Sequence, residues 1–126
     1  MKISLAIGAA ILALAPSAAA SAQQPGDWVL AQWQGGHLWF PGVVHSIGED
    51  GSVAVRYDDS TSEIRPANQV KPYDWRVGSR IDAIWSGDGL WYAATITAAD
   101  PNGSNLTVRF DDGIVEQTVT GRCRSE

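Results

Sequence analysis

The stretch Ala83–Ala94, AIWSGDGLWYAA, places a Trp at the end of one apolar run and a Leu-Trp-aromatic sequence at the start of the next. A turn containing glycine separates the two runs. The same arrangement occurs about fifty residues earlier at Ala31–Gly42, AQWQGGHLWFPG. The repetition continues, because VAVRYDDSTSE at Val53–Glu63 aligns with LTVRFDDGIVE at Leu106–Glu116. Self-similarity at a fixed period indicates that the chain contains two copies of one structural unit.

Each unit is predicted to be a small sheet of five short strands. Apolar and polar residues alternate along Asp27–Trp33 and again along Ser52–Tyr57, which is the period of half-buried strands. Pro41–Gly42 predicts a bulge or sharp bend in the second strand. Ile64 is expected to point inward from the fourth strand. No segment of the first unit has a convincing helical period, so a sheet curled into a barrel, which removes exposed edges, is the expected architecture.

We therefore predict an all-β protein with two tandem five-stranded barrels, the first at residues 26–72 and the second at 77–124. A short linker at residues 73–76 joins them. This linker contains Tyr73 and Trp75, whereas a flexible tether would be rich in Gly and Ser. We expect the linker to pack and to fix the relative orientation of the two units.

Residues 1–22 have the features of a secretory signal peptide. Lys2 supplies the positive charge, Ile3–Leu14 is apolar, and Ala20-Ser21-Ala22 has the form of a cleavage site. The apolar run is shorter than the roughly 20 residues that span a bilayer. We expect a cleaved leader and a periplasmic or secreted protein, with no membrane insertion after cleavage. An N-terminal membrane anchor is the alternative.

The charge of the chain limits its partners. Nine Lys and Arg residues against 14 Asp and Glu residues give a net charge of −5. Without a basic stripe the chain cannot displace counterions from phosphates, so we do not expect nucleic acid as a partner. Cys123 is the single cysteine, which excludes an intramolecular disulfide. Its alignment with Val70 predicts a small buried apolar side chain, and a thiol that pairs with another chain is the alternative.

An enzyme is not expected from these residues. The two histidines, His37 and His45, lie in different contexts, and the sequence has no Cys/His cluster with metal-ligand spacing. Nothing resembles a nucleophile elbow or a loop that cradles phosphate. Adjacent Asp residues on turns are poorly placed for acid–base chemistry across a substrate. We predict a non-enzymatic binding module without a metal or cofactor.

Three aromatic residues recur at equivalent strand ends in the two units. In a curled five-stranded sheet, the end of the first strand, the start of the second and the end of the third converge at one rim. Three rings around a gap form a cage for a cation, because each ring presents a negative face. A carboxylate beside the third ring would add charge complementarity. The candidate ligand-binding residues are Trp33, Phe40, Tyr57 and Asp59 in the first unit and Trp85, Tyr92, Phe110 and Asp112 in the second.

The same residues also have a purely structural interpretation. Aromatic residues in a small barrel are often core, and Asp in a turn often accepts hydrogen bonds from its own backbone. Trp39 and Trp91 point away from the two triads, and we expect them to pack, at the contact between the units. On this interpretation the chain is a structural or cell-envelope interaction domain. A sheet edge or a groove between the barrels would then bind a protein or glycan.

The segments WSGDGLWYAATI and VRFDDGIVE resemble the Tudor/Agenet-like group of SH3-like barrels. That group shares a Trp, an acidic-Gly turn, an aromatic residue and a later aromatic residue with an acidic turn. The resemblance covers both units, with Ser60 in place of the turn Gly in the first. It implies a five-stranded SH3-like barrel for each unit. It also implies that the two triads bind methylated Lys or Arg in aromatic cages.

From the rings and the resemblance together, we expect the partner to be a protein or a small cationic ligand. The cationic group would be a methylated or unmodified Lys or Arg side chain of a protein, or a quaternary ammonium. The fourth aromatic residue of the best-developed Tudor cages has no counterpart here. Asp59 and Asp112 stand near that place.

Overall fold

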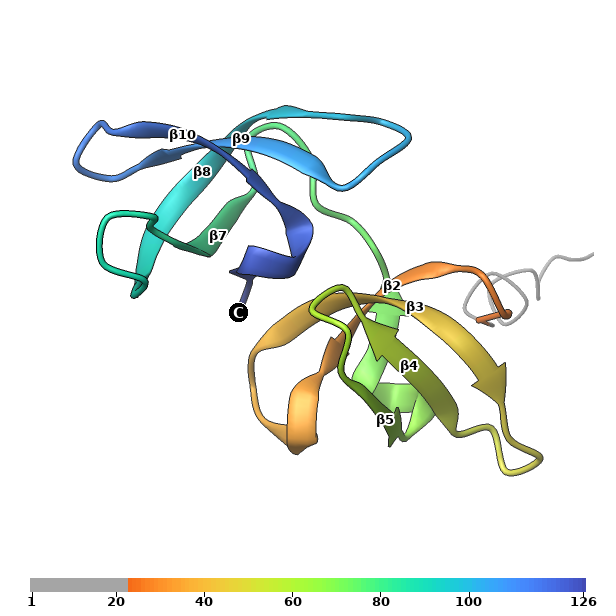
Figure 1. The fold of residues 1–126 in the computed structure, drawn as a ribbon. Helices are drawn as coiled ribbons and strands as arrows, with labels where there is room; N and C mark the ends of the chain where they lie inside the picture. Colours follow the sequence, from red (N-terminus) through yellow and green to blue (C-terminus); the bar gives the residue numbers. More distant parts are fainter. Residues whose placement is uncertain (1–22) are drawn as a thin grey trace, which may run out of the picture.

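The computed structural model describes residues 23–126, and the predicted signal peptide at residues 1–22 lies outside this part of the chain. The described residues form two five-stranded antiparallel sheets and contain no α-helix. Each sheet is strongly curled, and the two form separate lobes with the C-terminus between them (Figure 1). The prediction of an all-β protein with two tandem SH3-like barrels is confirmed.

The first barrel has the strand order β5-β4-β3-β2-β6. Its last strand pairs with its first, which curls the sheet around one interior. Alternate residues of each strand face this interior. The strands are β2 (Trp28–Gln32), β3 (Trp39–Ile47), β4 (Val53–Tyr57), β5 (Ser62–Arg65) and β6 (Val70–Pro72), with 3-10 helices η3 (Trp33–Gly35) and η4 (Ala67–Gln69). The interior is filled by Val29, Ala31, Val44, Val53, Val55, Tyr57 and Val70.

The second barrel repeats this connectivity in the order β10-β9-β8-β7-β11. Its elements are β7 (Arg80–Ile84), β8 (Trp91–Ala99), β9 (Asn105–Phe110), β10 (Val115–Val119), η5 (Thr120–Arg122) and β11 (Cys123–Arg124). Cys123 is fully buried in its core, as its alignment with Val70 predicts. The core residues of this barrel are Ile81, Ala83, Ala94, Ile96, Leu106, Val108, Phe110 and Cys123.

Two local predictions for the first barrel are wrong. The prediction at Pro41–Gly42 was a bulge or a sharp bend, and the bulge is not there: the register of β3 is continuous through these residues and shifts between Val44 and Ser46. Gly42 instead lies where two strands pack closely, since a Cβ there would come within 2.7 Å of the carbonyl oxygen of Arg56. Ile64 does not point inward but is 64% exposed, because the alternation along β5 is opposite to the predicted one.

The two barrels share an apolar cluster. Strand β2 is buried on both faces: Val29 and Ala31 face the interior of the first barrel, whereas Leu30 belongs to the core cluster of the second. The linker also packs, as predicted. Its Trp75 is 8% exposed, and the indole Nε1 donates a hydrogen bond to Ser125 Oγ at 3.0 Å. The outward side of β2 and the linker therefore join the two cores.

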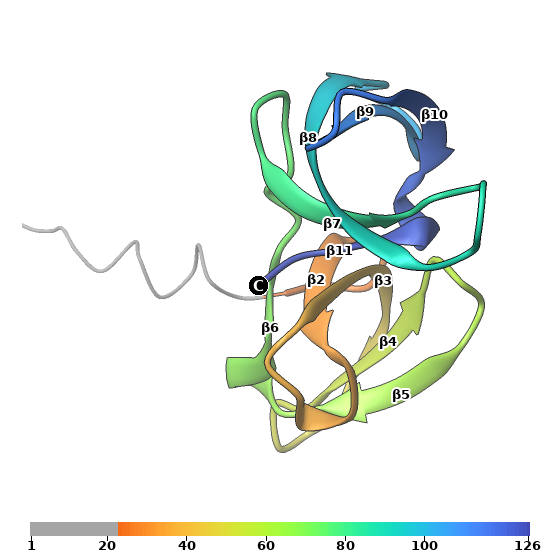
Figure 2. The same cartoon turned by 90° about the vertical axis from the view of Figure 1, so that its left-hand side faces the viewer.

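The C-terminal strand bridges the two barrels. β11 pairs with β7 of its own barrel and lies between that strand and the first barrel (Figure 2). Immediately after β11, Ser125 forms two backbone hydrogen bonds with Trp39, with N···O distances of 2.7 and 3.0 Å. The Thr120 hydroxyl donates a hydrogen bond to the Asp58 carboxylate of the first barrel. These polar contacts set the orientation in which the barrels meet.

Candidate functional site

The second aromatic triad lies at one rim of its barrel. Trp85 follows β7, Tyr92 lies near the start of β8, and Phe110 ends β9. The Trp85 and Tyr92 ring centroids are 6.1 Å apart with an interplanar angle of 82°. Those of Tyr92 and Phe110 are 6.5 Å apart at 88°. Both pairs have the edge-to-face geometry that aromatic quadrupoles favour. The structure therefore brings together the three predicted rings.

These three rings line a pocket with a volume of about 470 Å³. Tyr92 is 41% exposed and Trp85 is partly buried, so both can meet a ligand from the solvent side. Phe110 is only 4% exposed and belongs to the core. The core interpretation thus applies to Phe110, which forms the bottom of the pocket. The cage interpretation applies to Trp85 and Tyr92. The remaining lining residues are Ala93, Asp111, Asp112 and Ile114.

The loop between β7 and β8 is held by several polar contacts. The Tyr92 hydroxyl donates a hydrogen bond to Asp88 in this loop, which raises the pKa of Tyr92. The Ser86 hydroxyl donates to Glu116 Oε1 of β10 at 2.8 Å. Gly87 packs against the Trp85 indole, since a Cβ at this position would come within 2.4 Å of Cζ2. The Trp85 and Tyr92 rings are therefore held in place before any ligand arrives.

Two aspartates, Asp111 and Asp112, line this pocket. Among the described residues, no basic side chain lines it. Asp111 forms a bidentate ion pair with Arg80, with distances of 2.7 and 2.9 Å. This hydrogen-bonded pair lowers the pKa of Asp111 and raises that of Arg80. Asp112 Oδ1 accepts a hydrogen bond from the backbone N–H of Ile114 at 3.0 Å, so this carboxylate also stabilises its turn.

The first triad has the same ring geometry. The Trp33 and Phe40 ring centroids are 6.1 Å apart, and those of Phe40 and Tyr57 are 6.5 Å apart. Trp33 lies in η3 and is 44% exposed, whereas Tyr57 is 3% exposed and forms part of the core. Asp59 Oδ1 accepts hydrogen bonds from the backbone N–H and the hydroxyl of Thr61, at 3.0 and 2.6 Å. Asp59 is thus a turn former, as the structural interpretation expects.

Two glutamates that the sequence analysis did not single out position both rims. Glu63 Oε2 accepts hydrogen bonds from the Tyr57 hydroxyl at 2.7 Å and from the Gln34 backbone N–H at 2.8 Å. Burial, and then this bond to Glu63, raise the pKa of Tyr57. Glu116 occupies the same place in the repeat and holds Ser86. The alignment of the two glutamates was the available signal. Their loop partners Gln34 and Ser86, however, are 29 and 30 residues away in the chain.

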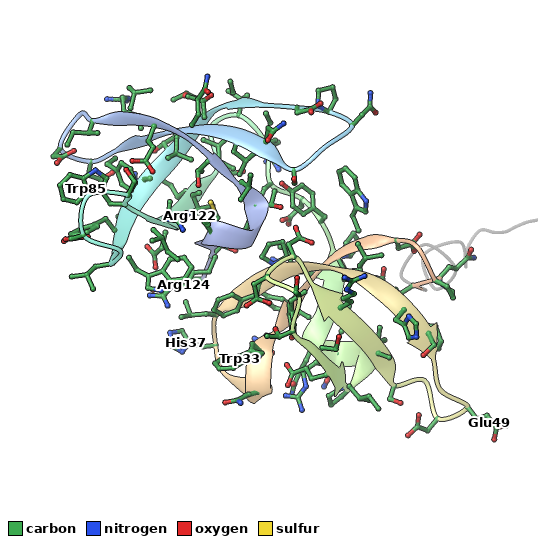
Figure 3. All side chains as sticks on the ribbon, viewed as in Figure 1. Trp33, His37, Glu49, Trp85, Arg122 and Arg124 are labelled. Atoms are coloured by element: carbon green, nitrogen blue, oxygen red, sulfur yellow. The ribbon has the colours of Figure 1, made fainter. Side chains whose placement is uncertain are left out.

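The first pocket differs from the second because both barrels build it. It has a volume of about 230 Å³, and its lining includes Trp91 and Arg124 from the second barrel. The ring centroid of Trp91 lies 6.3 Å from that of Phe40, which agrees with the predicted packing role of Trp91 between the units. Figure 3 shows Trp33 and Trp85 on the same side of the molecule, with Arg124 between them.

Comparison with known proteins finds a family similarity in the second repeat. Residues 73–116 match the sequence profile described as Survival motor neuron protein (SMN), Tudor domain. The second repeat is similar to this Tudor domain. The matched segment of this Tudor-like repeat contains the linker, β7 to β9 and all three rings of the larger pocket. Tudor domains are non-enzymatic binding modules. The resemblance inferred from the sequence motifs is therefore confirmed.

The solved structure of Arabidopsis thaliana AGDP1 AGD34 has 18% sequence identity and a TM-score of 0.40, and the match covers 87% of this chain and 86% of that one. None of the curated proteins matches the chain.

Within residues 23–126, no group of three or more His, Cys, Asp or Glu side chains is placed to hold a metal ion. In the same part of the chain, no helix has the length and apolarity needed to cross a membrane.

Proposed function

We propose that the Tudor-like second barrel binds a cationic group in the pocket formed by Trp85, Tyr92 and Phe110. The group is a methylated or unmodified Lys or Arg side chain of a protein, or a quaternary ammonium. The observation that carries this proposal is the arrangement of three edge-to-face rings around an open pocket of about 470 Å³ with Asp112 at its rim. Each cation–ring contact contributes roughly 0.5–2 kcal/mol.

The apolar lining favours a methylated cation over an unmodified one. An ammonium or guanidinium that enters the pocket needs hydrogen-bond partners for its N–H groups, and unpaired buried donors are costly. Methylation keeps the charge that attracts the rings and removes donors. Asp112 can still accept one hydrogen bond at the rim. We therefore expect affinity to rise with the number of methyl groups.

The affinity test uses Tyr92→Ala, because Tyr92 is 41% exposed and its loss should leave the barrel folded. We expect calorimetry with a trimethyllysine or dimethylarginine peptide to show binding that is weakened about tenfold or more, which corresponds to the loss of one ring contact of about 1.4 kcal/mol. Val77→Ala is the matched control, since Val77 is 62% exposed and lies outside the pocket. Unchanged affinity in a folded Tyr92→Ala protein would refute the cage.

We also propose that the chain acts outside the cytoplasm, in the periplasm or beyond, because residues 1–22 carry a signal-peptide pattern. On this proposal the ligand is an exported or extracellular cation. N-terminal sequencing of the protein recovered from its native host should begin at Gln23. A chain that retains Met1 in the cytoplasm would contradict this location.

One observation favours the alternative function of a cell-envelope interaction domain. A groove of about 440 Å³ runs between the barrels and is lined by Trp28, Tyr73 and Asp58. Trp28 is 47% exposed and packs edge-to-face with Tyr73 at 5.9 Å, so an aromatic surface and a carboxylate border this groove. Amide shifts around this groove on addition of cell-wall glycan fragments, unaffected by Tyr92→Ala, would support this alternative.

A further inference from the structure

The two aromatic pockets are built on the same plan, but their surroundings differ. The second pocket is lined only by residues of its own barrel. The first has about half the volume and is completed by side chains of the second barrel. The contrast arises because β11 and the start of β8 pack onto the rim of the first barrel, whereas nothing in the described part of the chain packs onto the rim of the second.

The side chain that distinguishes the first pocket is Arg124. Its guanidinium carbon lies 4.1 Å from the centroid of the Trp91 ring, which is cation–π distance. Its Nε lies 3.3 Å from Asp82 Oδ2 on β7, and its side chain is only 24% exposed. Trp91 in turn packs edge-to-face on Phe40 of the first triad. A cation supplied by the chain itself therefore already lies on an aromatic wall of the first pocket.

The first barrel has a corresponding cation–π contact, but that contact does not lie at an aromatic pocket. Lys71 follows Val70 as Arg124 follows Cys123, and its Nζ lies 4.6 Å from the centroid of the Trp39 ring. A basic residue over this Trp is thus a feature of the repeat. Lys71, however, does not line the second pocket. The Arg124 contact lies beside an aromatic triad only because the second barrel packs onto the rim of the first.

We infer that Arg124 is an internal cation that closes the first aromatic pocket to external cations, so that the chain binds one cationic group per molecule, in the second barrel. This inference rests on the proposed function and specifies which pocket performs it. An external cation that enters the first pocket would meet the positive charge of Arg124. The face of Trp91, which lines this pocket, is already covered by the guanidinium. The covalently attached arginine has a high effective concentration and loses no translational freedom when it binds.

The test is a two-dimensional amide NMR titration of residues 23–126 with a trimethyllysine peptide, for wild type and Arg124→Gln. Glutamine removes the charge and can still donate a hydrogen bond to Asp82. Wild type should show shifts only around Tyr92 and Ile114. Arg124→Gln should add a second set around Trp33 and Phe40, with affinity at the first pocket at least tenfold higher than in wild type. Lys71→Gln is the matched control and should add no second set.

A folded Arg124→Gln protein with shifts only at the second pocket, or none at either, would overturn the inference. Comparable shifts at both pockets in wild type would overturn it as well. If no variant responds around Tyr92 but Arg124→Gln responds around Trp33, the proposed function of the second barrel fails and the inference about Arg124 stands.

A second measurement on wild type does not depend on the folding of the variant. The Nε–H signal of Arg124, shifted by the Trp91 ring current, should not move when the peptide is added. Displacement of this signal together with shifts at Trp33 would show that an external cation enters the first pocket, and would contradict the inference.

Discussion

At the scale of single residues, each triad contains one core ring, one partly buried ring and one exposed ring. Phe110 and Tyr57 are 4% and 3% exposed, whereas Tyr92 and Trp33 are 41% and 44% exposed. A residue that ends β9 or β4 must face the barrel interior, because alternate residues of these strands are buried. The residues at the other two places lie just after the first strand and at the second position of the next strand, where Trp33 and Tyr92 are exposed to solvent. Substitution of the core ring should therefore mainly affect stability, and substitution of the exposed ring should mainly affect binding.

This difference predicts the effects of two alanine substitutions. Phe110→Ala should lower the free energy of unfolding by about 3–4 kcal/mol, as for other buried aromatic residues. Tyr92→Ala should lower it by less than about 1 kcal/mol, because the ring is partly solvated and its hydrogen bond to Asp88 is exposed. Urea denaturation of both variants checks this order. Equal losses of stability would mean that Tyr92 is core as well.

At the scale of elements, the turn after the third strand is built with different residues in the two barrels. Ser60 and Gly113 occupy the same place in the repeat and have positive φ values of 79° and 96°. Glycine adopts this left-handed conformation without the steric penalty of a Cβ atom. The first barrel therefore carries a local strain that the second avoids.

Exchanging these turn residues should have opposite effects. Ser60→Gly should stabilise the protein by about 0.5 kcal/mol, because relief of the strain exceeds the added flexibility of the unfolded chain. Gly113→Ser should destabilise it by about 1–2 kcal/mol. Chemical denaturation of the two single variants provides the measurement. A neutral Gly113→Ser variant would contradict this account of the turn.

The strands were predictable from the sequence because the alternation of apolar and polar residues and the turn residues are local features. The repeat gave two independent instances of the same pattern. The failures are equally instructive. Ile64 was predicted to face inward from its apolarity, but the inward place in β5 belongs to Glu63, whose carboxylate holds the Tyr57 hydroxyl and the first loop. These two hydrogen bonds, one of them to Gln34 in a distant loop, outweigh the local preference of a four-residue strand.

At the scale of the whole molecule, the two barrels share an apolar cluster and several polar contacts. A contact between barrels has no local signature, and so the shared cluster around Leu30 and the role of Arg124 were not predictable from spacing. Leu30 lies on β2 of the first barrel but is fully buried in the core cluster of the second. The position of the third ring in each triad, by contrast, followed from the repeat itself.

The shared cluster predicts cooperative unfolding. Leu30→Ala should destabilise the protein by about 2–5 kcal/mol, and probes in both barrels should lose protection together. Amide hydrogen exchange resolves the two barrels in one experiment. If Leu30→Ala leaves protection in the second barrel unchanged, the barrels are independent units.

The buried acidic groups predict a loss of stability at alkaline pH. Burial raises the pKa of Cys123 from 9.0 to about 12, and the pKa values of Tyr57 and Tyr73 are raised too, chiefly by burial. Above pH 9 the unfolded chain releases the thiol proton that the folded chain keeps, so stability should fall as the pH rises from about 9 to about 12. For Cys123 the slope is about 1.4 kcal/mol per pH unit.

Urea titrations at several pH values test this dependence. Cys123→Val, which copies Val70 of the first barrel, should remove the contribution of the thiol and flatten the curve just above pH 9. A wild-type curve that stays level from pH 8 to pH 11 would contradict the burial of these groups.

On the proposed function, the second pocket recognises positive charge through its rings. The most direct measurement compares amide NMR shifts of the wild-type protein with a trimethyllysine peptide and with the same peptide carrying the uncharged tert-butyl isostere. The cage predicts shifts at Tyr92, Ala93 and Ile114 with the cation and little or no response to the isostere, because shape and apolar area are nearly the same and only the charge differs. Equal shifts with both peptides, or shifts confined to the groove beside Trp28, would contradict it.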